Sequence, residues 1–578
     1  MSIERSEQEL VRLDNLAKLQ ELGIEPYPAA MFETNSTVQK ILDNFDAESE
    51  EVMHVTIAGR LMFKRVQGKA SFALLKDSTG TIQLYFNRDE LCPEDDKTLY
   101  NTVFKKLIDR GDFIGVSGPV FTTKKGETTV RVESMTFLSK AIRPLPAVKT
   151  DADGNVYDAF SDPELRYRMR YVDLVVNEKV RETFIKRAKI MNSMREFFSG
   201  YGYLEVETPI LQPIPGGAAA RPFITHHNTL DMPLYLRIAN ELYLKRLIVG
   251  GFEGVYEFAK DFRNEGMDRT HNPEFTVMEI YVAYKDYKWM MEFTEQMLEK
   301  VVTDLYGTTK VQLGGKEIDF KAPFHRISMI DAIKEHTGID INGMDEEQLR
   351  KVCDDLEIET APSMGKGKLI DEIFGEKCES SYVQPTFITD YPVEMSPLCK
   401  RHRDNPELTE RFELMVNGKE LANAYTELND PIDQLSRFEE QLKLSEKGDD
   451  EAMFIDHDFI RALEFGMPPC SGMGIGVDRL VMFLTDNDSI QEVLFFPQMR
   501  PEKRPEPPKP ENFVAIGVPE EWAEHVIKAG FKTVEALCET KDTKLHQTLN
   551  GYRKKNKLKI PALQLDQVKA WLTQEDEA

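Results

Sequence analysis

The stretch Val255-Tyr-Glu-Phe-Ala-Lys-Asp-Phe-Arg-Asn-Glu-Gly266 is followed closely by Phe275-Thr-Val-Met-Glu-Ile-Tyr-Val282. Both alternate with period two, which is typical of β-strands, because successive side chains of a strand point to opposite faces. In the first strand one face carries Glu257, Asp261 and Arg263. In the second strand one face is aliphatic and belongs in the core, while the other carries Phe275, Val277, Glu279 and Tyr281.

The polar face of this predicted hairpin combines groups that suit a nucleotide site. A flat guanidinium such as that of Arg263 matches phosphate or carboxylate oxygens, and the ring of Phe275 can stack on a base. A lone arginine–glutamate pair would fit a salt-bridged surface hairpin better. Four functional side chains on one face favour a binding site.

A glycine-rich segment, Gly472-Met-Gly-Ile-Gly-Val-Asp-Arg479, precedes the apolar run 480–484. We predict a turn that leads into a helix, with Arg479 in the first helical turn. Alternate glycines let the backbone approach a ligand closely, and a helix N-terminus favours anions. The segment lacks both the Gly-Lys-Ser/Thr of a Walker loop and the spacing of a Rossmann turn. It therefore indicates an anion site without giving its class.

A third segment, Phe412–Leu428, contains Asn417-Gly418, a strong signal for a two-residue hairpin turn. With that turn Glu413 and Glu420 share a face as diagonal neighbours about 7–8 Å apart. Their charges repel unless a cation lies between them, and magnesium with a phosphate substrate is the natural candidate. Two solvated glutamates on an exposed hairpin are the alternative.

Strict alternation would place Asn423, Tyr425 and Glu427 on the opposite face from these two glutamates. If all five side chains face one ligand, a β-bulge near Leu421–Ala422 must redirect the strand. An unbroken ladder through those residues would exclude a joint site.

The composition fits a large globular protein. Its 578 residues are 41% hydrophobic and 30% charged, and the chain is long enough for several domains. We expect no signal peptide and no membrane contact, because the first residues are charged and no apolar run could span a bilayer. Six scattered cysteines without a CxxC pair argue against zinc and disulfides and favour the cytoplasm. The net charge of −26 speaks against a protein coated in nucleic acid, although the basic patch 553–559 permits local contact.

The order of predicted elements indicates an α+β protein with several domains. Residues 1–145 begin with a helix, and the strands that follow have the pattern of an OB-fold barrel, with a helix between the third and the fourth: 55–66, 70–77, 81–87, 112–123 and 128–139. Such barrels commonly bind single-stranded nucleic acid.

The rest of the chain is predicted to form a large α/β region, a linker and a small helical domain. The α/β region covers residues 150–500 and includes a helical insertion near 330–380. Residues 501–510 are a proline-rich linker. Residues 511–578 are helical, with a small core formed by Trp522, Val526, Phe531, Val534 and Leu537.

Three of these segments resemble the signature motifs of the class II aminoacyl-tRNA synthetases. Phe262-Arg-Asn-Glu-Gly266 with His271-Asn-Pro-Glu-Phe-Thr276 is similar to motif 2, and Gly472–Arg479 is similar to motif 3. The helix Val180–Gly200 with Tyr203-Leu-Glu-Val-Glu-Thr-Pro209 resembles motif 1, which builds the dimer interface in that family. The resemblance covers roughly residues 5 to 500 and implies a catalytic domain with an antiparallel sheet flanked by helices.

The resemblance is closest to the lysine-specific members of the class, in the runs 214–218, 223–228, 236–246 and 420–428. It implies a two-step ligase. The carboxylate of L-lysine attacks the α-phosphorus of ATP to give lysyl-adenylate and pyrophosphate, and the 3′-terminal ribose of tRNA(Lys) then takes the lysyl group. The implied cofactor is Mg²⁺, and the implied assembly is a homodimer.

The resemblance also implies roles for individual residues. Arg263 and Arg479 would be catalytic, with Arg263 at the α-phosphate and the substrate carboxylate and Arg479 over adenine and at the γ-phosphate. Glu413 and Glu420 would bind the magnesium. The implied ATP set is Arg263, Glu265, His271, Asn272, Phe275, Glu413, Glu420 and Arg479. The implied lysine set is Gly217, Glu241, Arg263, Glu279, Tyr281, Asn423, Tyr425 and Glu427.

The choice of lysine also follows from charge, because a pocket that presents Glu241 and Glu427 suits an ammonium group with several donors. In the barrel, the resemblance makes four residues candidates for reading the anticodon: Arg65, Phe72, Gln83 and Glu133. Phe72 would stack on a base, but ordinary barrel core explains that residue equally well.

Two questions about function stay open at this level. The segments 516–519 and 529–534, with the basic residues 553–559, resemble a helix-hairpin-helix nucleic-acid module, but a solvated basic helix end explains them at least as well. Two other functions are alternatives to a tRNA ligase. A ligase that lysylates protein would lack the barrel, and a regulatory protein with a dead site would be expected to lose Arg263, Glu413, Glu420 or Arg479.

Overall fold

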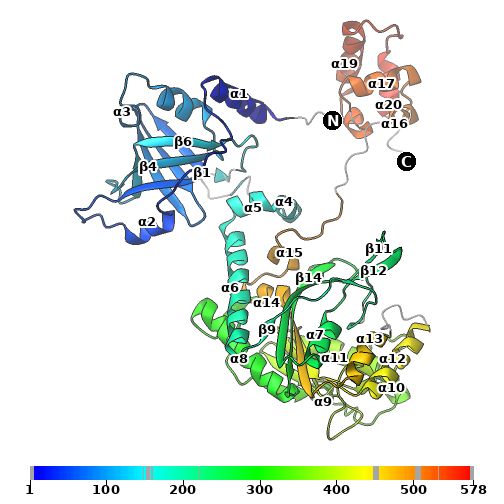
Figure 1. Cartoon of the computed structure of the whole chain (residues 1–578). Coiled ribbons are helices and arrows are strands. Elements are labelled where there is room, and N and C mark those ends of the chain that lie inside the picture. The colour runs from blue at the N-terminus through cyan, green and yellow to red at the C-terminus, as the bar shows by residue number, and fades with distance from the viewer. Residues whose placement is uncertain are drawn as a thin grey trace. The chain divides into compact units, whose positions relative to one another are not determined.

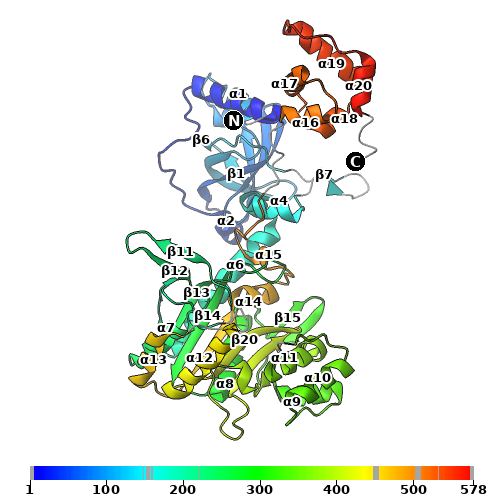
Figure 2. The same ribbon diagram turned by 90° about the vertical axis from the view of Figure 1, so that its right-hand side faces the viewer.

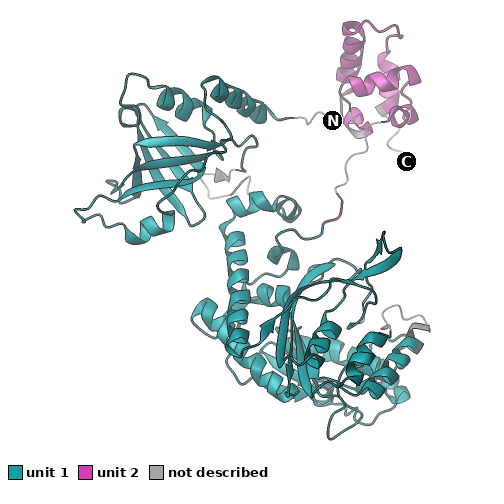
Figure 3. Ribbon diagram, in the orientation of Figure 1, with its two compact units in different colours: residues 1–498 teal, residues 499–578 magenta. Residues whose placement is uncertain are grey.

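The computed structural model describes residues 5–146, 149–150, 156–157, 160–218, 220–362, 364–446, 455–501, 509–531 and 533–572. It divides into two compact units, residues 1–498 and 499–578 (Figure 3). Most of the predicted linker 501–510 lies outside the described residues. Within the described ranges, no helix is long and apolar enough to cross a membrane.

The N-terminal part of the first unit is a closed barrel (Figure 1). Its strands are β1 (His54–Gln67), β2 (Ala70–Lys76), β3 (Thr81–Asn87), β4 (Phe113–Thr122), β5 (Thr128–Val132) and β6 (Ser134–Ser139). Strand β1 pairs with both β2 and β4, which closes the barrel. A helical segment, η1 (Leu99–Leu107), separates β3 from β4 as predicted. The predicted fifth strand is two strands, because the ladder breaks at Glu133, whose N–H donates to the carbonyl of Ser117 (2.9 Å).

Short helices accompany this barrel. Helix α1 (Glu7–Glu21) begins at Ser6, and the side chains of Ser6 and Glu9 each accept from the other residue's backbone N–H in a capping box. Helices α2 (Val38–Asn44) and α3 (Arg88–Leu91) are also capped, by Thr37 and Asn87. Helices α4 (Pro163–Arg168) and α5 (Arg170–Val176) follow the barrel in the chain.

An eight-stranded sheet forms the centre of residues 160–498, in the order β17-β18-β19-β20-β21-β14-β13-β9. Only the outer pairs β17–β18 and β13–β9 are parallel, and all other neighbours are antiparallel. The strands are β17 (His325–Ser328), β18 (Thr386–Thr389), β19 (Arg411–Val416), β20 (Lys419–Thr426), β21 (Cys470–Gly476), β14 (Glu274–Ala283), β13 (Gly254–Phe262) and β9 (Leu204–Glu205).

One face of this sheet is covered by helices α6 (Glu178–Gly200), α8 (Tyr287–Tyr306) and α14 (Val477–Leu484), which share one large apolar core with it. Figure 2 shows these helices beside the sheet. Met278 and Ile280 of β14 and Met473 of β21 point into this core and are at most 1% exposed. Because side chains alternate along a strand, the polar set on β14 faces the other side of the sheet.

Smaller elements surround the sheet. The predicted insertion is a group of three helices with its own apolar core, shown together in Figure 2: α9 (Met329–Thr337), α10 (Glu346–Asp355) and α11 (Lys366–Lys377). A three-stranded sheet consists of β10 (Leu211–Gln212), β12 (Met232–Leu236) and β11 (Ile224–His227). The remaining elements near the sheet are α7 (Glu241–Val249), β15 (Lys310–Leu313), β16 (Lys316–Asp319), α12 (Pro431–Glu446), α13 (His457–Glu464) and α15 (Ile490–Val493).

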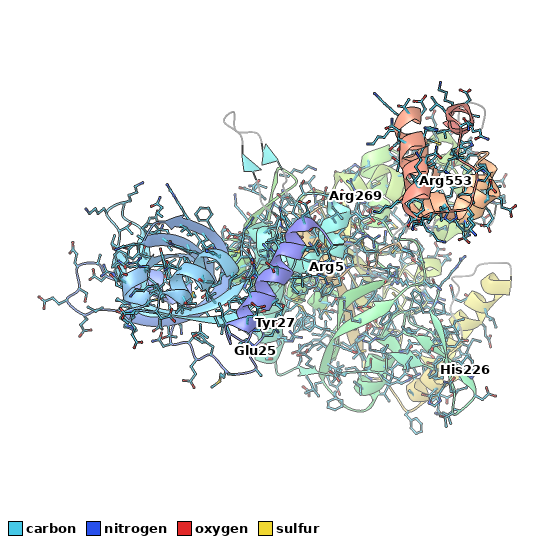
Figure 4. All side chains as sticks on the ribbon, turned by 90° about the horizontal axis from the view of Figure 1, so that it is seen from above. Arg5, Glu25, Tyr27, His226, Arg269 and Arg553 are labelled. Atoms are coloured by element: carbon cyan, nitrogen blue, oxygen red, sulfur yellow. The ribbon has the colours of Figure 1, made fainter. Side chains whose placement is uncertain are left out.

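The second unit contains five helices in its described residues: α16 (Pro510–Ala515), α17 (Glu520–Lys528), α18 (Val534–Cys538), α19 (Asp542–Lys555) and α20 (Leu565–Leu572). The predicted small core is confirmed: Trp522, Val526 and Leu537 are at most 1% exposed, and Phe531 and Val534 pack against them. Figure 4 labels Arg553, which lies on α19. The Nε of Arg553 donates to the carbonyl of Ile560 (2.5 Å).

Candidate active site

A cavity of about 850 Å³ lies on the polar face of the central sheet. The structure brings together almost all residues that were predicted to bind ATP or lysine. Those that line the cavity are Gly217, Glu241, Arg263, Glu265, His271, Asn272, Phe275, Glu279, Tyr281, Glu413, Glu420, Asn423, Tyr425 and Arg479. Glu427 is the exception, since it is 1% exposed and contacts Lys245 instead.

The predicted hairpin of β13 and β14 forms one wall of this cavity. The two strands pair antiparallel, with Asp261 opposite Phe275 and Glu257 opposite Glu279. The guanidinium carbon of Arg263 lies 5.2 Å from the centre of the Phe275 ring. A cation beside an aromatic ring suits a nucleotide, because the cation can bind phosphate oxygens while the ring stacks on the base.

Strands β19 and β20 lie on the other side of β21 in the same sheet, also line the cavity, and contain the β-bulge that the joint site required. Met415 is opposite Glu420, but Leu414 is opposite Ala422, so Leu421 is the extra residue. Both Leu421 and Ala422 point into the core and are at most 2% exposed. The bulge places Glu420 and Asn423 on the same face, and the prediction is confirmed.

Glu413 and Glu420 are close enough to influence each other's ionisation. Burial raises the pKa of Glu413 to about 7, the nearby charge of Glu420 adds to this rise, and Arg411 opposes it. Arg411 donates to Glu413 Oε1 (2.6 Å) and to Asn423 Oδ1 (3.1 Å). The sequence prediction missed Arg411, although it lies two residues before Glu413 on the same strand face.

The glycine-rich segment differs from the prediction. Residues Gly472–Gly476 do not form a turn but the strand β21, because β14 and β20 pair with it on both sides. Gly472 is needed for packing: a Cβ there would lie 2.3 Å from Tyr281 Cε1 and 2.3 Å from Glu427 Oε1. Arg479 is in the first turn of α14 as predicted, and its Nη1 lies 3.8 Å from Glu420 Oε2.

A set of hydrogen bonds ties the three motif-like segments together. Asp478 on α14 accepts from the backbone N–H of Thr276 on β14 (2.7 Å) and pairs with Arg187 on α6 (2.6 Å). Arg187 also donates to the hydroxyl of Thr276 (3.0 Å). These contacts fix the helix that carries Arg479 against the strand that carries Phe275.

Buried acids form the floor of the cavity. Arg237 bridges Glu257 (2.8 Å) and Asp261 (3.2 Å) behind the wall. Burial raises the pKa of Asp261 to about 7 and raises that of Glu279 well above its usual range, with Asp261 as the second cause for Glu279. The hydroxyl of Tyr281 donates to Glu279 (3.0 Å). A cation bound at this end of the cavity would favour the ionised forms of these acids.

The loop between β13 and β14 carries the more exposed predicted ATP residues. His271 Nδ1 lies 2.8 Å from Asp268 Oδ2, and this contact is the largest cause of the lowered pKa of Asp268. Both polar atoms of the Asn272 side chain form hydrogen bonds. Its Nδ2 donates to the carbonyl of Glu274 (2.5 Å), and its Oδ1 accepts from the backbone N–H of Gln498 (3.2 Å). Glu265 and His271 are exposed at the cavity mouth.

In the barrel, the predicted anticodon residues lie outside the apolar core. Phe72 is half-buried and alternates with buried neighbours, so barrel core does not explain it. Its ring lies 5.3 Å from that of Tyr85, and Arg65 is its partner across the strands. Gln83 accepts from Thr129 (2.9 Å), and Glu133 lies 3.0 Å from His54. Tyr85 is an aromatic residue of this face that the sequence prediction missed.

Comparisons with known proteins agree with this architecture. The family model described as tRNA synthetases class II (D, K and N) matches residues 162–500, and that of the OB-fold nucleic acid binding domain matches residues 55–138. The chain belongs to the class II tRNA synthetases. Residues 501–578 lie beyond both matches.

Within this class the chain belongs with the lysine–tRNA ligases. It is 66% identical over 570 residues to the lysine–tRNA ligase of Porphyromonas gingivalis, which covers 98% of both chains. It is 67% identical over 499 residues to that of Christiangramia forsetii, covering 86% of this chain and 87% of the relative. The lysine–tRNA ligase of Azobacteroides pseudotrichonymphae is 64% identical, and the match covers 99% of that relative but 86% of this chain.

Two glycines of β21 give a matched test of how this site is built. A Cβ on Gly472 would overlap Tyr281 and Glu427, whereas the nearest atom to a Cβ on Gly474 is Glu279 Cγ at 3.7 Å. We expect Gly472→Ala to cost about 1–3 kcal/mol through overpacking and to lower Tm, and Gly474→Ala to leave Tm nearly unchanged. Thermal unfolding followed by circular dichroism compares the two. Equal Tm values for both variants would contradict this description of the packing.

Proposed function

We propose that this cavity carries out both steps of lysine–tRNA ligation. One observation carries the proposal: a single cavity is lined both by Arg263 and Arg479 and by the buried acids Glu241 and Glu279. Arginine suits the phosphates of ATP, and the acids suit the ammonium of lysine. A substrate with an anionic side chain would meet repulsion at the acidic end.

The chemistry follows from positioning and charge. With its ammonium at Glu241, the lysine substrate directs its carboxylate toward Arg263, which also faces the α-phosphate. The carboxylate oxygen attacks the α-phosphorus, pyrophosphate leaves, and the ribose hydroxyl of tRNA then attacks the lysyl carbonyl and releases AMP. No side-chain nucleophile is required, because alignment and neutralisation of charge supply most of the acceleration in such steps.

The pair Glu413 and Glu420 fits magnesium. Both are oxygen donors at the cavity wall, and their mutual repulsion is relieved by a divalent cation between them. No cluster of three or more potential metal ligands occurs among the described residues. Two carboxylates alone agree with Mg²⁺, which usually completes its shell with substrate phosphates and water, and the ion would neutralise phosphate charge.

Arg263 gives the most direct test of these roles. We expect Arg263→Ala to lower lysine-dependent ATP–pyrophosphate exchange by at least 100-fold, because the guanidinium contacts the group that gains charge during transfer. Circular dichroism should show an unchanged fold, since Nε of Arg263 has no hydrogen-bond partner within the described part of the chain. Exchange at the wild-type rate would contradict the role assigned to Arg263.

For the barrel, we propose anticodon recognition by the outward residues around Phe72. Aromatic side chains with neighbouring arginines are a common surface for unpaired bases. The rings of Phe72, Tyr85 and Phe121 form a continuous series, and the guanidinium carbon of Arg131 lies 5.0 Å from the Phe121 ring centre.

Phe72→Ala separates tRNA recognition from amino-acid activation. Loss of one stacked base costs about 1–3 kcal/mol, so we expect kcat/KM for tRNA(Lys) to fall roughly 5- to 150-fold. Pyrophosphate exchange, which needs no tRNA, should stay at the wild-type rate. Val66→Ala, at an exposed position of the neighbouring strand, serves as the control. Wild-type charging by Phe72→Ala would exclude a stacking role.

We propose a homodimer, with the region of α6, β9 and the sheet β10-β12-β11 as the interface. Several large apolar side chains are exposed there, and such patches commonly mark interfaces: Leu204, Ile210, Leu211, Ile224 and Leu230. His226, labelled in Figure 4, belongs to β11 in this sheet. The proposed compartment is the cytoplasm, where tRNA is charged.

For the second unit, we propose auxiliary contact with tRNA phosphates. Eight lysines or arginines but only two aspartates occur between Lys541 and Leu572. The side chains of Lys554, Lys555, Lys557 and Lys559 are exposed.

A chain shortened to end at Pro501 tests the second unit. We expect its pyrophosphate exchange to match the full chain, since the cavity lies within the first unit. Its kcat/KM for tRNA should be several-fold lower at low salt, and the difference should vanish at high salt, because phosphate contacts are screened. Equal tRNA charging at both salt concentrations would remove this role.

A further inference from the structure

A lysine of the chain itself lies at the acidic end of the cavity. Lys245 on α7 is completely buried, and its Nζ lies 2.5 Å from Glu241 Oε1 and 2.5 Å from Glu427 Oε2. The rings of Tyr425 and Phe459 lie 5.5 and 5.9 Å from the same ammonium. The chain thus contains an ammonium of the same kind as the one its substrate carries.

The two acids differ in their access to the cavity. Oε1 of Glu241 accepts from Lys245 and from the hydroxyl of Tyr425 (2.6 Å), whereas its Oε2 has no donor among the residues that the structure describes. Glu241 lines the cavity and Glu427 does not. Gly217, with φ +91°, lies beside Glu241, since a Cβ added there would lie 3.4 Å from Glu241 Cβ.

We infer that Lys245 is a positioning residue for specificity: it binds one oxygen of each glutamate and leaves one oxygen of Glu241 for the ammonium of the substrate. This inference rests on the proposed placement of that ammonium at Glu241. In this arrangement two carboxylates share one internal cation, which leaves a single negative charge to be matched. One further cationic group completes the balance, and a neutral or anionic side chain does not.

The surroundings show why an internal cation is needed. Burial raises the pKa of Glu427, and the ammonium of Lys245, 2.5 Å away, is the strongest influence in the opposite direction. The other ionisable groups that face this cluster come from β14, β20, β21 and an adjoining loop, and none of them is cationic: Glu279, Tyr281, Cys399, Tyr425 and Cys470. Without Lys245, burial would favour the protonated forms of the glutamates and remove the charge that attracts the substrate.

The same contacts could serve stability alone, as a buried ion pair within the core. Such pairs contribute little net stability compared with apolar residues of similar volume. The two roles predict different dependences on pH. A purely structural role predicts an equal defect at every pH, whereas a positioning role through charge predicts a defect that shrinks once the glutamates ionise.

The test measures KM for lysine and for ATP by pyrophosphate exchange at pH 7 and pH 9, for Lys245→Met, Glu427→Gln and the double variant. We expect each single variant to raise KM for lysine at least tenfold at pH 7, with KM for ATP within twofold of wild type. For Lys245→Met the defect should shrink at pH 9. The double variant, which again leaves one net negative charge at Glu241, should have a lower KM for lysine than either single variant. Lys351→Met, an exposed lysine on α10, is the control.

Two outcomes overturn the inference: a KM for lysine within twofold of wild type in both single variants, or an equal defect at both pH values with no recovery in the double variant. If Lys245→Met does not fold, Glu427→Gln still decides, because Glu427 acts through Lys245 and is not in the cavity wall. Glu241→Gln separates this inference from the proposal on which it rests. A normal KM for lysine in Glu241→Gln would contradict the placement of the ammonium itself.

Discussion

Balance of charge in a buried pocket is the constraint on which this molecule depends. A carboxylate removed from water must be paired or protonated. The acidic end of the cavity contains Glu241, Glu279 and Glu427, all at most 8% exposed. We propose that Lys245 satisfies part of this requirement and that the ammonium of the substrate satisfies the rest. In this proposal, the choice of amino acid is a property of this small charged cluster.

Two features of the backbone shape the cavity beside this cluster. The bulge at Leu421 brings Glu420 and Asn423 to one face of β20, which a regular strand could not do. The absence of a side chain at Gly472 makes space for Tyr281 and Glu427 across the sheet. Both features lie in the central strands of the sheet, where pairing on two sides fixes their position. The exposed residues that were predicted to bind ATP lie instead on the loop between β13 and β14.

Much of this could be predicted from the sequence, because local periodicity is a direct consequence of strand geometry. The two faces of β14, the turn at Asn417-Gly418 and the need for a bulge all follow from counting residues. The glycine segment was predicted as a turn, since isolated glycines do not reveal that strands pair on both sides of them. The pairing of Glu427 with Lys245 also depends on the fold, because 182 positions separate the two residues in the chain. The contact of Glu241 with Lys245 could have been predicted, since residues four apart meet on one face of a helix.

We propose above all that this cavity selects a cationic amino acid and activates it with ATP. The most direct measurement is ATP–pyrophosphate exchange by the full chain with each standard amino acid in turn, in the absence of tRNA. We expect strong exchange with lysine and only background exchange with aspartate and asparagine, whose side chains cannot neutralise the acidic end. Exchange with aspartate or asparagine at a rate comparable to that with lysine would contradict it.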